Sequence, residues 1–187
     1  MVLIGLLGKK RAGKDTLADY LVQNHQYKKI SIADHLKQVC KILFGFTTDQ
    51  LYGNSKEVVD DYWNITPREA YQFIGTDIFR NSIEPLIPNI KDTFWLKCFY
   101  RKFKNENLEN ENIVIADLRF QNEVDLIHEL GGVVYKIVRP NLEYSDNHES
   151  EKGIDDINNF NDIIINDKDL QCFIKSFENK LNNICKL

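Results

Sequence analysis

The sequence predicts an α/β fold, in which a doubly wound parallel five-stranded sheet carries a phosphate-binding loop (P-loop). Short runs of apolar and β-branched residues alternate with segments of helical periodicity, which is the order found in parallel α/β proteins. The runs are apolar on both faces, as expected for strands that helices cover on each side. A loop with two glycines joins the first run to the first helical segment, where this fold class binds phosphate.

Each expected strand is a short run rich in isoleucine, valine or leucine between polar segments. In chain order the strands are expected at 2–7, 28–32, 112–116, 133–138 and 162–165.

The expected helices show apolar residues at helical spacing, and two of them have clear end signals. Thr66 is an N-cap residue, Pro67 suits the first helical position, and Glu69 completes a capping box. The pair Gly131-Gly132 is a typical helix stop. In chain order the helices are expected at 14–24, 34–44, 67–80, 91–104, 121–130 and 168–184.

The length of 187 residues fits a single domain, residues 1–187, with two interruptions of the strand–helix alternation. Residues 34–105 are mainly helical and lie between the second and third strands. Residues 139–161 are polar and have little periodicity. The sheet and its helices would then be built from residues 1–33, 106–138 and 162–187.

The composition favours a soluble globular protein, with 43% hydrophobic and 28% charged residues. The net charge of −4 argues against nucleic acid as the main partner. The four cysteines are scattered, which is typical of reduced thiols in a cytoplasmic protein. We expect no signal peptide and no membrane span, because the apolar stretch at the N-terminus is too short.

The clearest motif is the P-loop at residues 8–16, which follows the first strand. Gly8 and Gly13 let the backbone curl and turn several N–H groups inward. Lys14 stands where an ammonium reaches the outer phosphates, at the positive end of a helix dipole. Lys10 and Arg11 add positive charge within the loop.

The P-loop departs from the common G-x-x-x-x-G-K-[ST] pattern at its last position. Asp15 occupies the place of the serine or threonine whose hydroxyl meets Mg²⁺, and Thr16 comes next. Either the Asp15 carboxylate ligates the ion or the Thr16 hydroxyl does so.

Residues after the third strand are candidates for a site, because parallel sheets bind ligands at the carboxyl ends of their strands. Asp117 could hold Mg²⁺ or its waters, and Arg119 could reach a phosphoryl group. Glu123 lies one helical turn beyond Arg119 and could pair with it. The alternative is an ordinary set of surface charges.

Further candidates stand at the ends of other elements. Arg68 opens the helix expected at 67–80 and could fork onto a phosphate, or be a solvated side chain. Gly75 within that helix suggests a close approach or a kink. Arg139 ends the fourth strand, and Asn166 follows the fifth, where it meets either a base or ribose or caps the last helix. No G-x-S-x-G hydrolase elbow and no N-K-x-D guanine motif occurs.

Taken together, these motifs resemble those of the deoxynucleoside monophosphate kinases of bacteriophages and large DNA viruses. The matching residues follow in order over nearly the whole chain, and the family's loop also has Lys-Asp-Thr after its second glycine. They are residues 10–19, 33–37, 66–69, 75–77, Trp95, 117–123, 138–140, 148–151 and 165–167.

The resemblance implies a nucleoside-monophosphate-kinase-like fold that binds ATP and Mg²⁺ over the P-loop and phosphorylates deoxynucleoside monophosphates (dNMPs), supplying DNA precursors. Residues 34–105 would form the monophosphate-binding insert, and 139–161 a short lid. The resemblance places these residues around the dNMP: Lys37, Arg68, Gly75, Thr76, Trp95, Asp117, Arg119 and Glu123. It assigns to ATP and phosphate Gly8, Lys10, Gly13, Lys14, Asp15, Thr16 and Asn166. It makes catalytic residues of Arg11, Lys14, Asp15, Arg119 and Arg139.

Three readings of the function stay open from the sequence. The chain resembles a dNMP kinase, and the family suggests a homodimer. A P-loop kinase of another small acceptor, of the dephospho-coenzyme A or phosphomevalonate type, would share the same loop. A non-catalytic nucleotide-binding regulator would bind ATP without turnover that depends on an acceptor. The chain is shorter than the larger phage members between residues 45 and 66, so the sequence leaves the specificity of the monophosphate pocket open.

Overall fold

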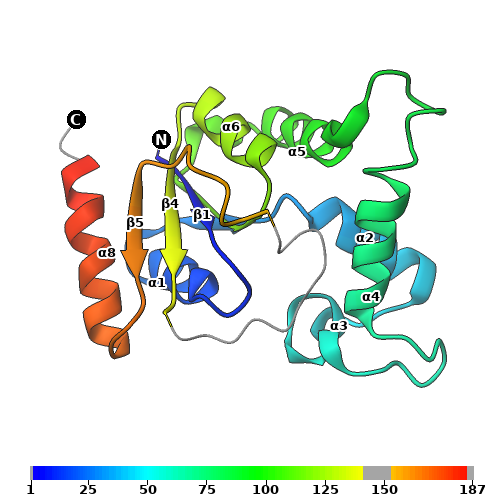
Figure 1. The fold of residues 1–187 in the computed structure, drawn as a ribbon, viewed down its shortest axis with the longest axis horizontal. Helices are drawn as coiled ribbons and strands as arrows, with labels where there is room; N and C mark the ends of the chain where they lie inside the picture. Colours follow the sequence, from blue (N-terminus) through cyan, green and yellow to red (C-terminus); the bar gives the residue numbers. More distant parts are fainter. Residues whose placement is uncertain (1, 141–152, 185–187) are drawn as a thin grey trace. The chain divides into compact units, whose positions relative to one another are not determined.

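The computed structural model describes residues 2–140 and 153–184, and within it the chain forms two compact units (Figure 1). Unit 1 contains residues 1–31 and 106–187, and unit 2 contains residues 32–105. Unit 1 holds the sheet and the P-loop, whereas unit 2 is helical.

The sheet of unit 1 has five parallel strands in the order β2-β3-β1-β4-β5. β1 lies between β3 and β4, which the chain forms much later, so the carboxyl end of β1 is the switch point at which this fold class binds ligands. The strands are β1 Leu3–Leu7, β2 Lys28–Ile30, β3 Ile113–Leu118, β4 Val133–Val138 and β5 Asp162–Ile165.

Helices cover both faces of this sheet. On one face α1 (Lys14–His25) and α8 (Leu170–Ile184) pack on a buried cluster that includes Ile4 and Tyr135. On the other face α6 (Gln121–Glu129) contacts β1 and β4. The doubly wound fold predicted from the sequence is therefore confirmed.

Unit 2 is built around three helices, α2 (Asp34–Phe44), α4 (Pro67–Gln72) and α5 (Phe94–Asn105). α2 contacts both of the others. Side chains buried in this unit include Leu36, Cys40, Trp95, Phe99 and Phe103. The remaining short elements are α3 Thr48–Tyr52, η1 Asn54–Glu57, η2 Phe73–Ile78 and η3 Lys91–Thr93.

Some predicted boundaries were wrong. The helix expected at 67–80 is α-helical only to Gln72 and continues as one π-helical stretch, η2, which includes Gly75. The helix expected from 91 begins with a 3₁₀ turn, and the last helix begins at Leu170. α3, η1 and the 3₁₀ turn η4 (Leu108–Asn110) were not predicted. The third strand extends to Leu118, so Asp117 lies inside it.

Candidate active site

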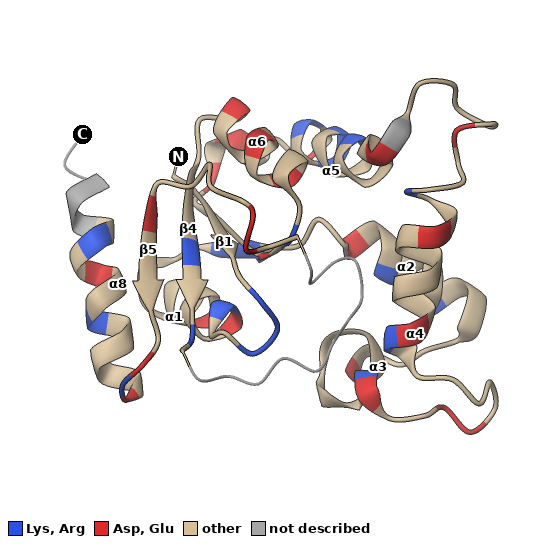
Figure 2. Cartoon of the chain, in the orientation of Figure 1, with Lys and Arg blue, Asp and Glu red and all other residues tan. Residues whose placement is uncertain are grey.

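The P-loop joins β1 to α1 and contains three residues with positive φ angles. The φ angles of Gly8, Arg11 and Gly13 are 156°, 62° and 112°. A Cβ atom at Gly8 would lie 2.5 Å from the carbonyl oxygen of Ile137, and one at Gly13 would lie 2.7 Å from Nδ2 of Asn166. Both glycines are therefore required by space as well as by conformation. Figure 2 shows Lys and Arg running along this loop after β1.

Side chains from the strand ends hold the P-loop by its carbonyl groups. Asn166 Nδ2 donates to the carbonyl oxygen of Ala12 at 2.9 Å, and Arg139 Nη1 donates to that of Arg11 at 3.5 Å. Carbonyls turned outward toward donors leave the N–H groups of such a loop to face an anion. The amide of Asn166 braces the loop, a role not predicted from the sequence, and its expected contact with a nucleotide stays a prediction.

Lys14 is buried beneath the loop, with 5% of its surface exposed. Its ammonium donates to the carbonyl oxygens of Gly8 at 2.5 Å and Lys9 at 2.8 Å. The two loop carbonyls thus hold the Lys14 ammonium in place. A phosphate oxygen can replace them as the acceptor, because it forms a stronger, charge-assisted hydrogen bond with the ammonium.

Asp15, at the position that departs from the common motif, forms an ion pair with β2. Its Oδ1 lies 2.9 Å from Nζ of Lys29, which also lies 2.8 Å from Oδ1 of Asp19. Burial lowers the pKa of Lys29, but hydrogen bonds with Asp19 and Asp15 outweigh it, so the pKa is raised. Asp15 and Thr16 are both exposed at the start of α1. The choice of Asp15 or Thr16 as Mg²⁺ ligand stays a prediction.

The register between β1 and β3 shifts in the stretch of β3 that contains Asp117. Gly5 pairs with Ile115, but Leu7 pairs with Leu118, so β3 contains one extra residue between these pairs. Such a bulge redirects a side chain and is common next to active sites. The Asp117 carboxylate accepts a hydrogen bond from Ser31 Oγ at 2.5 Å.

Glu123 has a structural role that the sequence did not predict. Its carboxylate is buried, with 6% of the residue exposed, and accepts from the backbone N–H groups of Arg119 at 2.7 Å and Phe120 at 3.1 Å. The contact expected from the sequence was a pair with the Arg119 side chain. Glu123 thus caps α6 and fixes the backbone that carries Arg119, and its pairing with the Arg119 side chain stays a prediction.

Residues 153–160, here called the strap, bind to both the P-loop and β4. Lys9 of the loop forms an ion pair with Asp155 at 2.5 Å. Lys136, 9% exposed within β4, donates to the carbonyl oxygens of Asp155 at 3.1 Å and Ile157 at 3.0 Å. Its ammonium also lies 5.1 Å from the ring centroid of Phe160. The only signal in the sequence was one lysine within an apolar strand.

In unit 2, Arg68 and Lys37 are each held by a neighbouring side chain. Arg68 Nε donates to Oε1 of Glu57 at 2.5 Å, and 19% of the Arg68 side chain is exposed. Lys37 Nζ lies 4.4 Å from the ring centroid of Tyr52. Their partners, Glu57 and Tyr52, lie between residues 45 and 66, where no helix or strand was predicted from the sequence.

Gly75, Thr76 and Trp95 form an interior contact in unit 2. A Cβ atom at Gly75 would lie 2.6 Å from Cδ2 of Leu36, so the close approach suggested by this glycine is present. The indole Nε1 of Trp95 donates to the Gly75 carbonyl at 2.9 Å, which the π-helical stretch leaves accessible. Thr76 and Trp95 are each 6% exposed. These residues hold η2 against α2 and α5, and their contact with a nucleotide stays a prediction.

The predicted dNMP residues fall into two groups. The five residues Lys37, Arg68, Gly75, Thr76 and Trp95 lie in unit 2, and Asp117, Arg119 and Glu123 lie in unit 1. The family match at 148–151 and most of the predicted lid lie outside the described residues.

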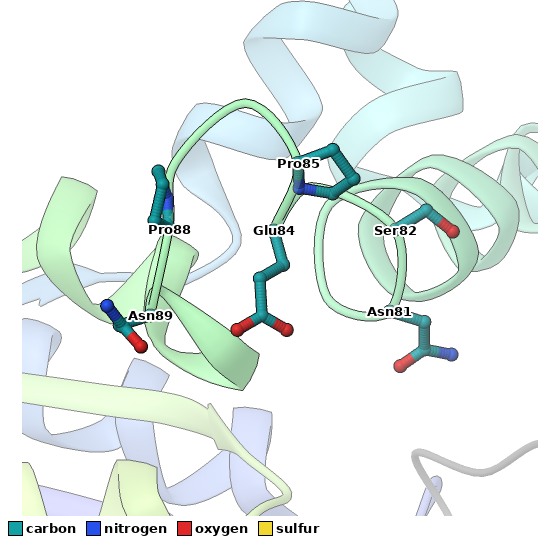
Figure 3. Close-up of a pocket in the computed structure, with 6 residues that line it drawn as sticks. All are labelled: Asn81, Ser82, Glu84, Pro85, Pro88 and Asn89. Atoms are coloured by element: carbon teal, nitrogen blue, oxygen red, sulfur yellow. The ribbon is translucent and has the colours of Figure 1, made fainter.

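Unit 2 also has an open pocket of about 530 Å³ along the segment from η2 to η3 (Figure 3). Glu84 lies near the middle of this segment, between Ser82 and Pro88. Its lining residues are Asn81, Ser82, Glu84, Pro85, Pro88 and Asn89. No predicted site residue lines it, so it has no part in the chemistry considered below.

P-loop phosphotransferases bind the transferred phosphate with a lysine beneath a P-loop, at the switch point of a parallel sheet. Lys14 and the loop after β1 have this arrangement. The chain belongs to the deoxynucleotide monophosphate kinase family, whose model matches residues 2–59 and 46–177. It is thus a nucleoside monophosphate kinase, as the resemblance in the sequence implied.

Two known proteins illustrate this relationship. A protein of Acanthamoeba polyphaga mimivirus, provisionally named a deoxynucleotide monophosphate kinase, is 36% identical over 192 residues that span both chains completely. The structure of dephospho-CoA kinase from Campylobacter jejuni superimposes with a TM-score of 0.55, covering 98% of this chain and 97% of that one. At 15% identity, the second likeness shows the fold alone. None of the helices among the described residues is long and apolar enough to cross a membrane.

Proposed function

We propose that this protein transfers the γ-phosphoryl group of ATP to the phosphate of a dNMP, forming ADP and a deoxynucleoside diphosphate. The observation that supports this most is Lys14, whose buried ammonium lies on the carbonyls of the P-loop. Phosphoryl transfer needs positioned positive charge more than covalent chemistry. The family name and the mimivirus relative support a deoxynucleotide as the acceptor.

In the proposed reaction a phosphate oxygen of the dNMP attacks the γ-phosphorus of ATP, and the bond to the β-phosphate oxygen breaks. Lys14 offsets the charge on the transferred group, while Lys10, Arg11 and Arg139 supply further positive charge around the loop. The N–H groups of the P-loop orient the phosphates. Arg119, on the backbone fixed by Glu123, completes the unit 1 residues that we assign to the transfer.

The oxygen donors at the start of α1 fit Mg²⁺, which prefers carboxylate, hydroxyl and water oxygens. Asp15 and Thr16 are exposed there, and Asp117 stands on the neighbouring β3. When bound, the ion would neutralise phosphate charge.

We further propose that residues 34–105 bind the acceptor and residues 139–161 act as the lid, which protects ATP from water. Arg68 and Lys37 would hold the dNMP phosphate. We expect the enzyme to act in the cytoplasm, that of the host cell if it is viral, as a homodimer and without nucleic acid or membrane as partner.

A coupled assay of ADP release tests this proposal, using ATP, Mg²⁺ and each of the four common dNMPs. We expect at least one dNMP to raise the rate about 100-fold or more above that without acceptor. Dephospho-coenzyme A, phosphomevalonate and the matching ribonucleotides serve as controls. Turnover with dephospho-coenzyme A or phosphomevalonate alone would support another small acceptor, and ATP binding without any acceptor-dependent rate would support a regulator.

A further inference from the structure

The segment from Thr48 to Glu57, here called the arm, lies against both of the cations assigned to the dNMP phosphate in unit 2. It consists of α3 and η1. From α3, the Tyr52 ring lies 4.4 Å from Nζ of Lys37. From η1, the Glu57 carboxylate accepts from Nε of Arg68 at 2.5 Å.

The arm is fixed to the rest of unit 2 chiefly through Gln50. The Gln50 side chain completes a capping box with Thr47 and donates to Oδ2 of Asp60 at 2.8 Å. The backbone carbonyl oxygen of Gln50 accepts from the Tyr71 hydroxyl at 2.7 Å. Leu51 is 1% exposed, so the arm is also anchored by an apolar side chain.

Tyr71 lies on the same helix as Arg68, α4, and its hydroxyl is hydrogen-bonded to the arm. Burial raises the pKa of Tyr71, and the charge of a Tyr52 phenolate would add to this shift, whereas Arg68 opposes it. The pairs Tyr52–Lys37 and Glu57–Arg68 are joined through the arm, which supplies both Tyr52 and Glu57.

Each contact restricts its cation in a way that suits an anionic ligand. A carboxylate on Nε fixes the plane of a guanidinium, and the edge formed by Nη1 and Nη2 is the one that forks onto a phosphate. An aromatic face attracts an ammonium without neutralising its charge. A side chain that is already oriented loses less conformational entropy when the ligand binds, so binding is tighter.

We propose that the arm positions the acceptor-binding cations, with Glu57 orienting Arg68 and Tyr52 orienting Lys37. This inference rests on the proposed function, because it assigns Arg68 and Lys37 to the dNMP phosphate. Glu57 and Tyr52 are positioning residues, and each acts only through its cation.

A double-mutant cycle tests the inference by calorimetric titration of a dNMP accepted by the wild type, with steady-state kinetics alongside. Glu57→Ala should raise the Kd and KM for the dNMP about 5- to 10-fold, with the KM for ATP unchanged. In the Arg68→Ala background the same change should have no further effect, because the residue it positions is gone. A merely structural role would instead add to the loss caused by Arg68→Ala.

The second pair is tested with conservative and non-conservative changes at Tyr52. Tyr52→Phe keeps the aromatic face under Lys37 and should retain dNMP binding, whereas Tyr52→Leu should weaken it about 3-fold. The matched control for Glu57→Ala is Glu111→Gln, which breaks an exposed ion pair with Lys28 in unit 1. It should leave the Kd for the dNMP and the KM for ATP unchanged.

The possible failures are distinguishable. If the wild type phosphorylates no dNMP, the proposed function is wrong, and the inference falls with it. If the wild type is active but Glu57→Ala leaves dNMP affinity unchanged or improves it, only the inference is wrong. Improved binding would mean that the Glu57 charge mainly repels the acceptor.

Discussion

Replacing Lys136 with methionine tests whether the strap is held by the buried ammonium described above. Met has a similar length and is apolar, so the change removes the donor and keeps most of the volume. Lys136 donates to the carbonyl oxygens of Asp155 and Ile157 and is 9% exposed. After the change, both carbonyls keep their place in the strap but lose this donor.

The expected loss of stability follows from the two hydrogen bonds that Lys136 donates. A buried polar group that loses its partner costs about 1–3 kcal/mol, and hydrogen bonds to a charged group are at the upper end. Removal of a buried charge offsets part of this cost. We therefore expect Lys136→Met to lower the free energy of unfolding by about 2–4 kcal/mol. Because Asp155 pairs with Lys9, the KM for ATP should also rise a few-fold.

Urea unfolding followed by far-UV circular dichroism measures this loss, and Lys28→Met is the matched control. Lys28 forms an ion pair with Glu111 at 3.4 Å, and about half of each side chain is exposed. A pair of this kind contributes about 0–1 kcal/mol. If Lys136→Met were no more destabilising than Lys28→Met, with equal slopes in urea, the strap would not depend on the buried ammonium.

Three further predictions concern the site. Lys14→Ala should lower kcat about 100- to 1000-fold in a folded protein, and a variant that keeps half of the wild-type kcat would remove Lys14 from the mechanism. Asp15→Asn should raise the Mg²⁺ concentration for half-maximal rate more than the KM for ATP; an unchanged value in a Mg²⁺ titration at saturating ATP would remove Asp15 from metal binding. Arg68→Ala should raise the KM for the dNMP about 10-fold or more with little change for ATP, whereas Arg119→Ala should also lower kcat, and lysine should rescue neither fully. Steady-state kinetics with each substrate varied in turn decide this last point, and the opposite pattern for Arg68 would contradict its role in acceptor binding.

Features set by local chemistry were predictable from the sequence. The P-loop follows from its glycines between an apolar strand and a helix, and the start of α4 follows from Thr66, Pro67 and Glu69, whose capping box is present. The parallel sheet follows from strands that are apolar on both faces. Each of these signals lies within a few consecutive residues.

Features that depend on residues far apart in the chain were not predictable in the same way. Asn166 and Ala12 are separated by 154 positions, yet the amide of one holds the carbonyl of the other. The extra residue in β3 is visible only against its partner β1, which sets the register. α3 has five residues and depends on tertiary contacts, since helices of that length are not stable alone. The role of Glu123 was missed because the sequence does not show whether a carboxylate binds a side chain or the backbone.

The central claim is that the γ-phosphoryl group of ATP is transferred to a dNMP through Lys14. The most direct measurement is anion-exchange separation of the nucleotides after incubation of the enzyme with ATP, Mg²⁺ and an accepted dNMP. We predict that ADP and the deoxynucleoside diphosphate form in equal amounts with the wild type, and that both nearly vanish with Lys14→Ala. ADP formed without a deoxynucleoside diphosphate, or equal product yields from the two proteins at matched times within the linear range, would contradict this claim.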